Sequence, residues 1–228
     1  MKAIILSGGM GTRLRPITDY IPKGLVPVDN IPIIDWQIRY FKKFGIKDFV
    51  ICTGYLSKEL VIYLESKIFG VKIKYSVEKT PLGTGGALKK ALKYVDDDNF
   101  FVINGDIITN IDLMKLKSHP NSIAIIPLRT KYGVVYVSGN KVQGFEEKPE
   151  ICTHWMNAGI YYLNMEIVKY LPNIGNLEAK TFPLLAKKEK LHISKFNNAF
   201  WNSIDSFKDI DECVMSMKKT RYVKFLSK

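Results

Sequence analysis

Strand-like apolar runs alternate with helical patterns through the first half of the chain, and this alternation limits its fold more than any other feature. The first run covers residues 2–7, and an amphipathic stretch that ends at a glycine covers residues 33–44. The pattern repeats about every 25 residues, which indicates βαβ units and a mostly parallel sheet. The other predicted elements of this half are strands at 48–53, 71–77 and 100–103 and helices at 57–69 and 84–94, with Ser57 as the N-cap of its helix.

The second half of the chain is expected to complete the same sheet. The turn Ser138-Gly139-Asn140 joins two short strands into a hairpin. No linker rich in proline, glycine or serine separates the halves, so we expect one α/β domain over residues 1–228, with a nucleotide-binding half at 1–110 and a mixed half at 111–228. The predicted elements of the mixed half are strands at 122–128, 133–137, 141–146, 158–163 and 192–196 and helices at 165–171, 177–188 and 206–220.

The chain is basic, with 34 lysines and arginines against 22 aspartates and glutamates and a formal net charge of +12. This balance favours an anionic partner, either a nucleic acid or a phosphorylated small substrate. The basic residues are scattered in the sequence, and none of the nucleic-acid recognition motifs is present. We therefore expect no nucleic-acid partner.

The apolar runs are far too short to span a membrane, and the start of the chain lacks the apolar length of a secretion signal. These features predict a soluble, cytoplasmic protein without a membrane partner. Cys52, Cys152 and Cys213 are widely separated, with no C-x-x-C spacing. They predict neither a zinc site nor a disulfide framework.

A glycine-rich turn follows the first strand directly. Gly8, Gly9 and Gly11 allow backbone N–H groups to face an anion, and Arg13 can reach a polyphosphate with a forked contact. The turn is not a P-loop, because no Gly-Lys-Ser/Thr follows it. It is also a poor dinucleotide fingerprint, because Leu14 stands at the third glycine position.

Three charged residues follow strand ends or rigid turns. Lys23 stands in a loop whose prolines restrict the backbone, which lowers the entropy lost in presenting its ammonium group. Glu78 presents only acceptors when ionised, which suits the two adjacent donors of guanine better than the edge of uracil or thymine. Asp106 follows the strand at 100–103, at the edge where open α/β sheets bind ligands, and a carboxylate there suits Mg²⁺ with phosphate oxygens completing its shell.

Further charged side chains stand where the strand at 141–146 ends. The carboxylate of Glu147 can accept hydrogen bonds from sugar hydroxyls, and the ammonium of Lys148 can hold a phosphate. Taken alone, this pattern is also typical of a hairpin end with solvated charges.

Together these motifs resemble those of the sugar-phosphate nucleotidylyltransferases, and most closely the short enzymes that act on mannose, heptose or N-acetylmuramate 1-phosphates and lack a β-helix domain. The resemblance implies a Rossmann-like nucleotide-diphospho-sugar transferase sandwich with a mostly parallel mixed sheet. It also implies a reaction that joins a sugar 1-phosphate to a nucleoside triphosphate and releases pyrophosphate. The motifs that carry it are G-G-x-G-T-R-L-x-P at 8–16, P-K at 22–23, E-x-x-P-L-G-T-G-G-A at 78–87, N-G-D at 104–106, Y-G-V-V at 132–135, F-E-E-K-P at 145–149, N-x-G-I-Y at 157–161 and W-x-x-I-D at 201–205.

The resemblance also implies a role for each matching residue, and it makes residues 111–228 the sugar-phosphate-binding half. The implied catalytic residues are Arg13, Lys23 and Asp106, and the implied ligands of Mg²⁺ or Mn²⁺ are Asp106 and Asp205. The implied nucleotide-binding residues are Leu6, Gly8, Gly9, Gly11, Thr12, Arg13, Glu78 and Gly83. The implied sugar-phosphate-binding residues are Lys23, Gly133, Glu147, Lys148 and Asn157.

The chain departs from the family pattern at two places. Gly24 replaces the second proline of P-K-P, which predicts a small loosening of that loop. Ser203 stands where many relatives carry the second metal-binding aspartate, so we assign that role to Asp205, by similarity to the cytidylyltransferases of choline phosphate and inositol phosphate. The alternative is a weakened metal site.

We expect GTP as the nucleotide donor, and UTP, dTTP or CTP remain alternatives. A catalytically weak regulatory subunit that binds nucleotide sugars is a third interpretation, which Ser203 motivates. The sugar and the oligomeric state are left open, and a homo-oligomer is compatible with the sequence.

Overall fold

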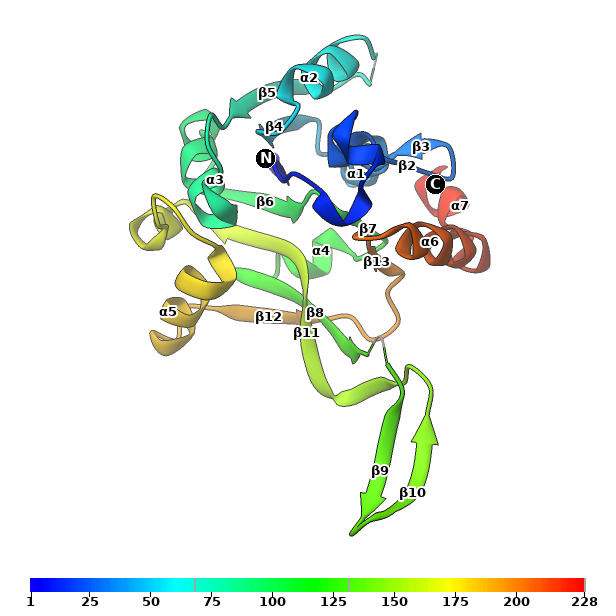
Figure 1. The fold of residues 1–228 in the computed structure, drawn as a ribbon. Coiled ribbons are helices and arrows are strands. Elements are labelled where there is room, and N and C mark those ends of the chain that lie inside the picture. Colours follow the sequence, from blue (N-terminus) through cyan, green and yellow to red (C-terminus); the bar gives the residue numbers. More distant parts are fainter. Residues whose placement is uncertain (68, 131, 228) are drawn as a thin grey trace.

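A seven-stranded sheet forms the centre of the protein in the computed structural model, which describes residues 1–67, 69–130 and 132–227 (Figure 1). The strand order is β12-β8-β11-β6-β1-β4-β5. All neighbouring pairs are parallel except those that β11 makes with β6 and β8. The predicted fold class, an α/β sandwich with a mostly parallel mixed sheet, is confirmed. The strands of this sheet are β1 (Lys2–Ser7), β4 (Asp48–Thr53), β5 (Lys72–Val77), β6 (Asn99–Asn104), β8 (Ser122–Arg129), β11 (Glu150–Asn164) and β12 (His192–Lys195).

Helices cover both faces of the sheet, so its central strands are buried on both sides. In β1, Ala3 and Ile5 point into the apolar cluster beneath α1, whereas Ile4 points into the cluster beneath α3. This is why the strand is apolar at successive positions rather than at alternate ones. The α-helices are α1 (Ile33–Lys43), α2 (Ser57–Glu65), α3 (Gly83–Ala91), α4 (Leu113–Leu116), α5 (Phe182–Lys187), α6 (Phe207–Thr220) and α7 (Tyr222–Ser227).

Most predicted elements are confirmed within a few residues, but four differ. The helix predicted at 57–69 ends at Glu65, and its N-cap is Leu56, with φ of +48°, so the assignment of Ser57 as the N-cap is wrong. Residue 68 lies outside the described residues. The helices predicted at 165–171 and 177–188 are a 3-10 helix over Met165–Tyr170 and a π-helical turn that continues into α5. The strand predicted at 158–163 is the end of the much longer β11, whose first residues, 150–157, mix polar and apolar types without a continuous apolar run.

Short elements without a strong sequence pattern complete the fold. Two of them, β7 (Ile107–Thr109) and β13 (Trp201–Ser203), pair with each other as an antiparallel ladder. The others are strands β2 (Pro27–Val28) and β3 (Ile31–Pro32) and 3-10 turns over Thr12–Leu14, Ile17–Asp19, Lys23–Leu25 and Leu92–Tyr94.

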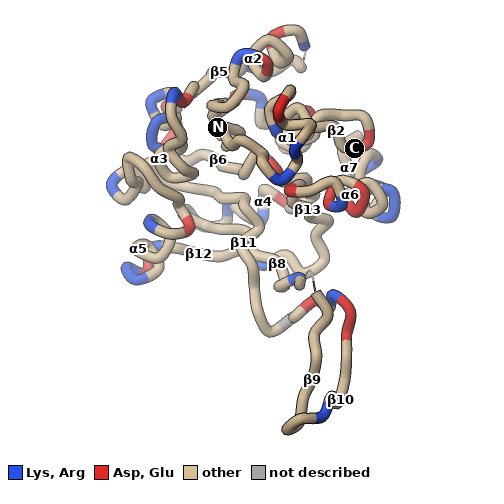
Figure 2. The backbone as a smooth tube through the Cα atoms, in the orientation of Figure 1, with Lys and Arg blue, Asp and Glu red and all other residues tan. Residues whose placement is uncertain are grey.

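The predicted hairpin is confirmed as a ribbon that projects from the body of the protein (Figure 1). It consists of β9 (Val134–Ser138) and β10 (Lys141–Glu146). Lysines and arginines are spread over the whole fold rather than gathered on one element (Figure 2). Among the helices of the described ranges, none combines the length and apolar character that crossing a membrane requires. Cys52 and Cys213 are free and buried, whereas the side chain of Cys152 lies outside the described part.

Candidate functional site

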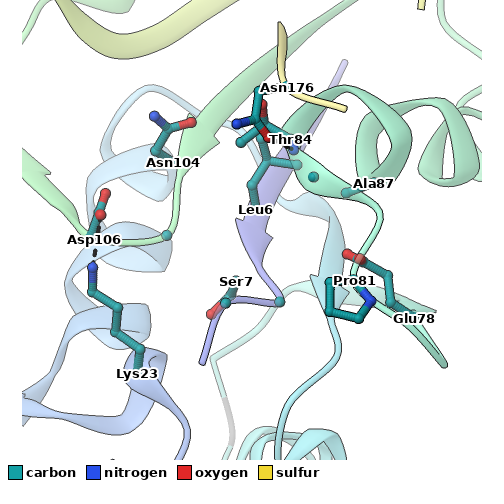
Figure 3. Close-up of a pocket in the computed structure, with 14 residues that line it drawn as sticks. Leu6, Ser7, Lys23, Glu78, Pro81, Thr84, Ala87, Asn104, Asp106 and Asn176 are labelled. Carbon is teal, nitrogen blue, oxygen red and sulfur yellow. Dashed lines mark hydrogen bonds and ion pairs between the residues drawn. The ribbon is translucent and has the colours of Figure 1, made fainter. Parts of the chain in front are cut away.

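A cavity opens at the carboxyl edge of the parallel strands. Because β4 and β6 flank β1 on opposite sides, the chain connections diverge at the end of β1, which is where open α/β sheets form a ligand-binding crevice. The cavity has a volume of about 300 Å³ and is lined by residues that follow three different strands (Figure 3). Gly8 and Gly9 follow β1, Glu78 follows β5, and Asp106 follows β6.

Glu78 is fixed beneath the glycine turn. Its Oε2 accepts a hydrogen bond of 2.9 Å from the backbone N–H of Leu82. A Cβ atom at Gly8 would lie 2.8 Å from Oε1 of Glu78, so only glycine allows the turn to pack this closely. Burial raises the pKa of Glu78, although the Leu82 N–H opposes this shift. The carboxyl group is therefore an oriented part of the cavity wall.

Two carboxylates converge on the ammonium group of Lys23. Its Nζ lies 2.8 Å from Oδ2 of Asp106 and 2.9 Å from Oδ1 of Asp205, and all three side chains are largely withdrawn from solvent. Arg13 also reaches this cluster, with its Nη2 3.1 Å from the same oxygen of Asp205.

The donor set of this cluster fits a divalent cation. Mg²⁺ in enzymes is bound by one or two carboxylates together with substrate phosphates, and the two aspartates already face one positively charged atom. No group of three or more potential metal ligands occurs among the residues that the structure describes. The remaining ligands of a bound metal would therefore be water and phosphate oxygens.

The short β7–β13 ladder brings Asp205 beside Asp106. Ser203 pairs with Ile107, the residue that follows Asp106, and the N–H of Ile204 donates to the carbonyl of Asp106 over 2.9 Å. The carboxylate of Asp209 then accepts from the N–H of Asp205 over 3.0 Å. These contacts fix the backbone of Asp205 beside Asp106, although 99 positions separate the two residues in the sequence.

A second cavity adjoins Asp205. Its lining combines aromatic and aliphatic surface from Trp201 and Met156 with the charged side chains of Lys148 and Lys208. Asp106 lines the first cavity and Asp205 the second, and Lys23 bridges these two carboxylates. The two cavities therefore meet at the carboxylate pair.

The structure brings most of the predicted residues to these cavities, although not all. Gly11, Thr12 and Arg13 lie on the loop outside the lining of the first cavity. The residues that line the first cavity are Leu6, Gly8, Gly9, Lys23, Glu78, Gly83 and Asp106, and those that line the second are Lys148 and Asp205.

Three predicted sugar-phosphate residues are absent from the lining of both cavities. Gly133 and Glu147 lie together at the base of the projecting hairpin, where a Cβ atom at Gly133 would be 3.1 Å from Oε2 of Glu147. The side chain of Asn157 makes hydrogen bonds inside the protein. Its Nδ2 donates to the hydroxyl of Tyr161 and its Oδ1 accepts from the N–H of Gly159, each over 2.9 Å.

Sequence reasoning missed several polar residues of the first cavity. Asn176 is brought to the cavity wall by a contact with the backbone N–H of Thr84, at 3.3 Å, and no local pattern marks this long-range pair. Ser7 also lines the cavity, and a Cβ atom at Gly24 would lie 2.7 Å from its Oγ. Gly24 is buried and packs closely against Ser7, and the expected loosening of its loop relative to one with proline stays a prediction.

The sequence matches the nucleotidyl transferase family over residues 2–220, and the chain belongs to this family. It is 41% identical to a D-glycero-alpha-D-manno-heptose 1-phosphate guanylyltransferase from Campylobacter jejuni, over 73% of this chain and 77% of that protein. It is 36% identical to the mannose-1-phosphate guanyltransferase of Saccharomyces cerevisiae over 92% of this chain, which spans only 62% of the yeast protein.

Solved structures show the same fold. HddC from Yersinia pseudotuberculosis, 26% identical, superimposes with a TM-score of 0.74 over 95% of this chain and 99% of that one. The same protein in complex with GMP-PN is 25% identical, with a TM-score of 0.74 and the same coverage. The predicted family is confirmed by the family match and by these relatives.

Proposed function

We propose that this protein transfers a guanylyl group from GTP to a sugar 1-phosphate and releases pyrophosphate. The observation that carries this proposal is the pair of carboxylates, Asp106 and Asp205, held around one ammonium where two cavities meet. A nucleotide in the first cavity and a sugar phosphate in the second would present their phosphates to each other at this point. Membership of the nucleotidyl transferase family and the guanylyltransferase relatives support the same reaction.

The first cavity suits a purine nucleoside triphosphate. Its glycine turn offers backbone N–H groups to phosphate oxygens, and Arg13 stands beside the turn. Glu78, fixed by Leu82, offers carboxylate acceptors to the adjacent N1–H and N2–H₂ donors of guanine. A relative crystallised with GMP-PN is consistent with this choice of base.

The reaction replaces one phosphoanhydride bond by another. An oxygen of the sugar phosphate forms a bond to the α-phosphorus, while the bond from that phosphorus to the bridging oxygen of the β-phosphate breaks. Pyrophosphate leaves with the electron pair of that bond. The attacking phosphate is already ionised at neutral pH, so the step requires no general base.

The protein's main task is to bring two polyanions together. In this proposal Lys23 and Arg13, which contact the two aspartates, offset phosphate charge and hold the reacting groups in line. Asp106 and Asp205 would hold Mg²⁺ or Mn²⁺, which, when bound, neutralises charge on the triphosphate. Asp209 fixes the backbone at Asp205, so Asp205 supplies the second carboxylate although position 203 is a serine. A complete pair of carboxylates favours an active enzyme over a regulatory subunit.

Pyrophosphate release tests the proposal. The purified protein is assayed with Mg²⁺ and each of GTP, UTP, CTP and dTTP, in combination with mannose, D-glycero-α-D-manno-heptose and glucose 1-phosphates. We expect the highest kcat/KM with GTP and mannose or heptose 1-phosphate. A preference for another nucleoside triphosphate would refute only the guanine assignment. If no combination of nucleotide and sugar 1-phosphate releases pyrophosphate, the result supports a regulatory subunit.

A further inference from the structure

Two lysines from distant parts of the chain meet in the second cavity. Lys148 follows the projecting hairpin, and Lys208 stands in the first turn of α6. Their Nζ atoms lie 3.4 and 4.0 Å from the same atom, Oε1 of Glu212. The two ammonium groups share one carboxylate oxygen, and each ammonium carries three N–H donors, so both lysines have donors left for a further anion.

The conformation of Lys148 is itself unusual. Its φ of +48° lies in the left-handed region, which residues other than glycine rarely adopt. Such backbone strain persists only where the surrounding structure enforces it, and it is common at ligand sites. Here it places the lysine in the cavity wall across from α6.

Lys208 is free to turn from Glu212 toward a ligand. Its side chain is 69% exposed, and its contact with Glu212, at 4.0 Å, is the longer of the two. The third cation of the cavity, Arg129, is more firmly engaged: its Nε lies 2.9 Å from Oε1 of Glu150, and its Nη1 donates to the carbonyl of Trp201. Lys208 is therefore the cation of this cavity that can most readily join Lys148 on an incoming anion.

We propose that Lys208 is a second phosphate-binding residue of the acceptor site and acts with Lys148 on the phosphate of the sugar 1-phosphate. This inference rests on the proposed function. A phosphate monoester carries close to two negative charges at neutral pH, which matches two ammonium groups better than one. Lys208 binds substrate and brings the acceptor toward the carboxylate pair, while the nucleotide side of the site is independent of it.

The test compares three single variants with the wild type. Lys208→Ala removes the ammonium, Lys208→Arg keeps a cation, and Lys218→Ala removes an exposed lysine near the other end of the same helix. Initial rates of pyrophosphate release are measured with the sugar 1-phosphate that the wild type uses best, first with that substrate varied and then with GTP varied. Melting temperatures are recorded for all four proteins.

We expect Lys208→Ala to raise the KM for the sugar 1-phosphate about tenfold, as is usual when a hydrogen bond to a charged group is lost. The KM for GTP and the melting temperature should stay at wild-type values, Lys208→Arg should recover most of the loss, and Lys218→Ala should match the wild type. An unchanged KM for the sugar 1-phosphate in Lys208→Ala overturns the inference. A rise in both KM values together with a lower melting temperature also overturns it, because that result assigns Lys208 to a structural clamp with Glu212.

Titration with inorganic phosphate separates this inference from the proposed function, because binding requires no turnover. We expect the wild-type protein to bind inorganic phosphate more tightly than Lys208→Ala does, with a steeper loss of affinity as ionic strength rises. Equal affinities in the two proteins contradict the role of Lys208, even if the wild type proves to be an active guanylyltransferase. If no sugar 1-phosphate is turned over but the difference in phosphate affinity is found, the proposed function fails and the phosphate site stands.

Discussion

The ammonium of Lys23 donates to Oδ2 of Asp106 over 2.8 Å, although 83 positions separate the two residues in the sequence. The same nitrogen donates to Asp205 over 2.9 Å. In this state the lysine occupies the place between two carboxylates that a divalent cation would take. When a metal–nucleotide complex binds, Lys23 is expected to exchange its carboxylate partners for phosphate oxygens.

Lys23→Ala should therefore affect metal binding and catalysis in opposite directions. Removal of the competing ammonium leaves Asp106 and Asp205 free for a cation, so we expect the variant without nucleotide to bind Mn²⁺ more tightly than the wild type does. The kcat/KM should nevertheless fall by about a hundredfold or more, because the phosphate charge loses its partner. Titration of Mn²⁺ by electron paramagnetic resonance and steady-state kinetics measure the two effects, and weaker Mn²⁺ binding in the variant would contradict the competition.

Asp205→Ala should resemble Asp106→Asn. Both variants remove one carboxylate of the pair, so both should lose most activity at low Mg²⁺ and regain part of it as the metal concentration rises. Ser203→Asp should be neutral or mildly favourable, because Asp205 already occupies the site. The measurement is kcat/KM as a function of Mg²⁺ concentration, and full turnover in excess chelator would show that no metal is required.

Arg13→Ala should impair catalysis without impairing folding. The side chain of Arg13 is 71% exposed and makes its contact with Asp205 at the surface, so its loss should not change the melting temperature. Charge that develops on the leaving pyrophosphate should lose a partner, which typically lowers kcat by about a hundredfold. A folded variant with unchanged kcat/KM would assign Arg13 to ordinary surface.

The sequence predicted the lining of the first cavity better than that of the second. Gly8, Gly9 and Asp106 follow strongly apolar strands, so their place at the sheet edge follows from strand order and polarity alone. Asp205 depends on the β7–β13 ladder, whose strands have three residues each and no alternating pattern, so only the resemblance indicated it.

Several residues beyond the first cavity are positioned by contacts that no local sequence pattern indicates. The side chain of Asn157 donates to the hydroxyl of Tyr161 within the fold, and Lys208 lines its cavity because α6 begins shortly after β13, next to Asp205. The N-cap of α2 was mispredicted for a related reason. The preceding residue, Leu56, adopts a left-handed conformation, which leucine rarely does and which the sequence therefore does not indicate.

Gly24→Ala should destabilise the protein through a single close contact. The new Cβ atom would lie 2.7 Å from Oγ of Ser7, and overpacking of this kind costs about 1–3 kcal/mol. Ser7→Ala alone should be nearly neutral, because Oγ is buried without a hydrogen-bond partner among the described residues. The double variant should recover much of the stability lost in Gly24→Ala, and urea unfolding of the four proteins measures this coupling. Strictly additive effects would show that the strain is relieved elsewhere.

Glu78 should set both the base preference and the pH dependence of nucleotide use. An ionised carboxylate accepts from both donors of guanine, whereas uracil and thymine would place a carbonyl against one of its oxygens. This difference corresponds to about tenfold to a hundredfold in kcat/KM. Glu78→Gln should therefore erode the preference for GTP over UTP and dTTP.

The pH profile follows from the same group. Burial raises the pKa of Glu78 above its usual value of 4.5, so the carboxylate becomes protonated at a higher pH than an exposed glutamate would. As the pH falls through that raised pKa, one acceptor is lost and the KM for GTP should rise, whereas the KM in Glu78→Gln should stay flat over the same range. Steady-state kinetics between neutral and mildly acidic pH measure this difference. If the wild type uses UTP or dTTP at least as well as GTP, or if both proteins show the same pH profile, the base is read by other groups near Gly83 rather than by Glu78.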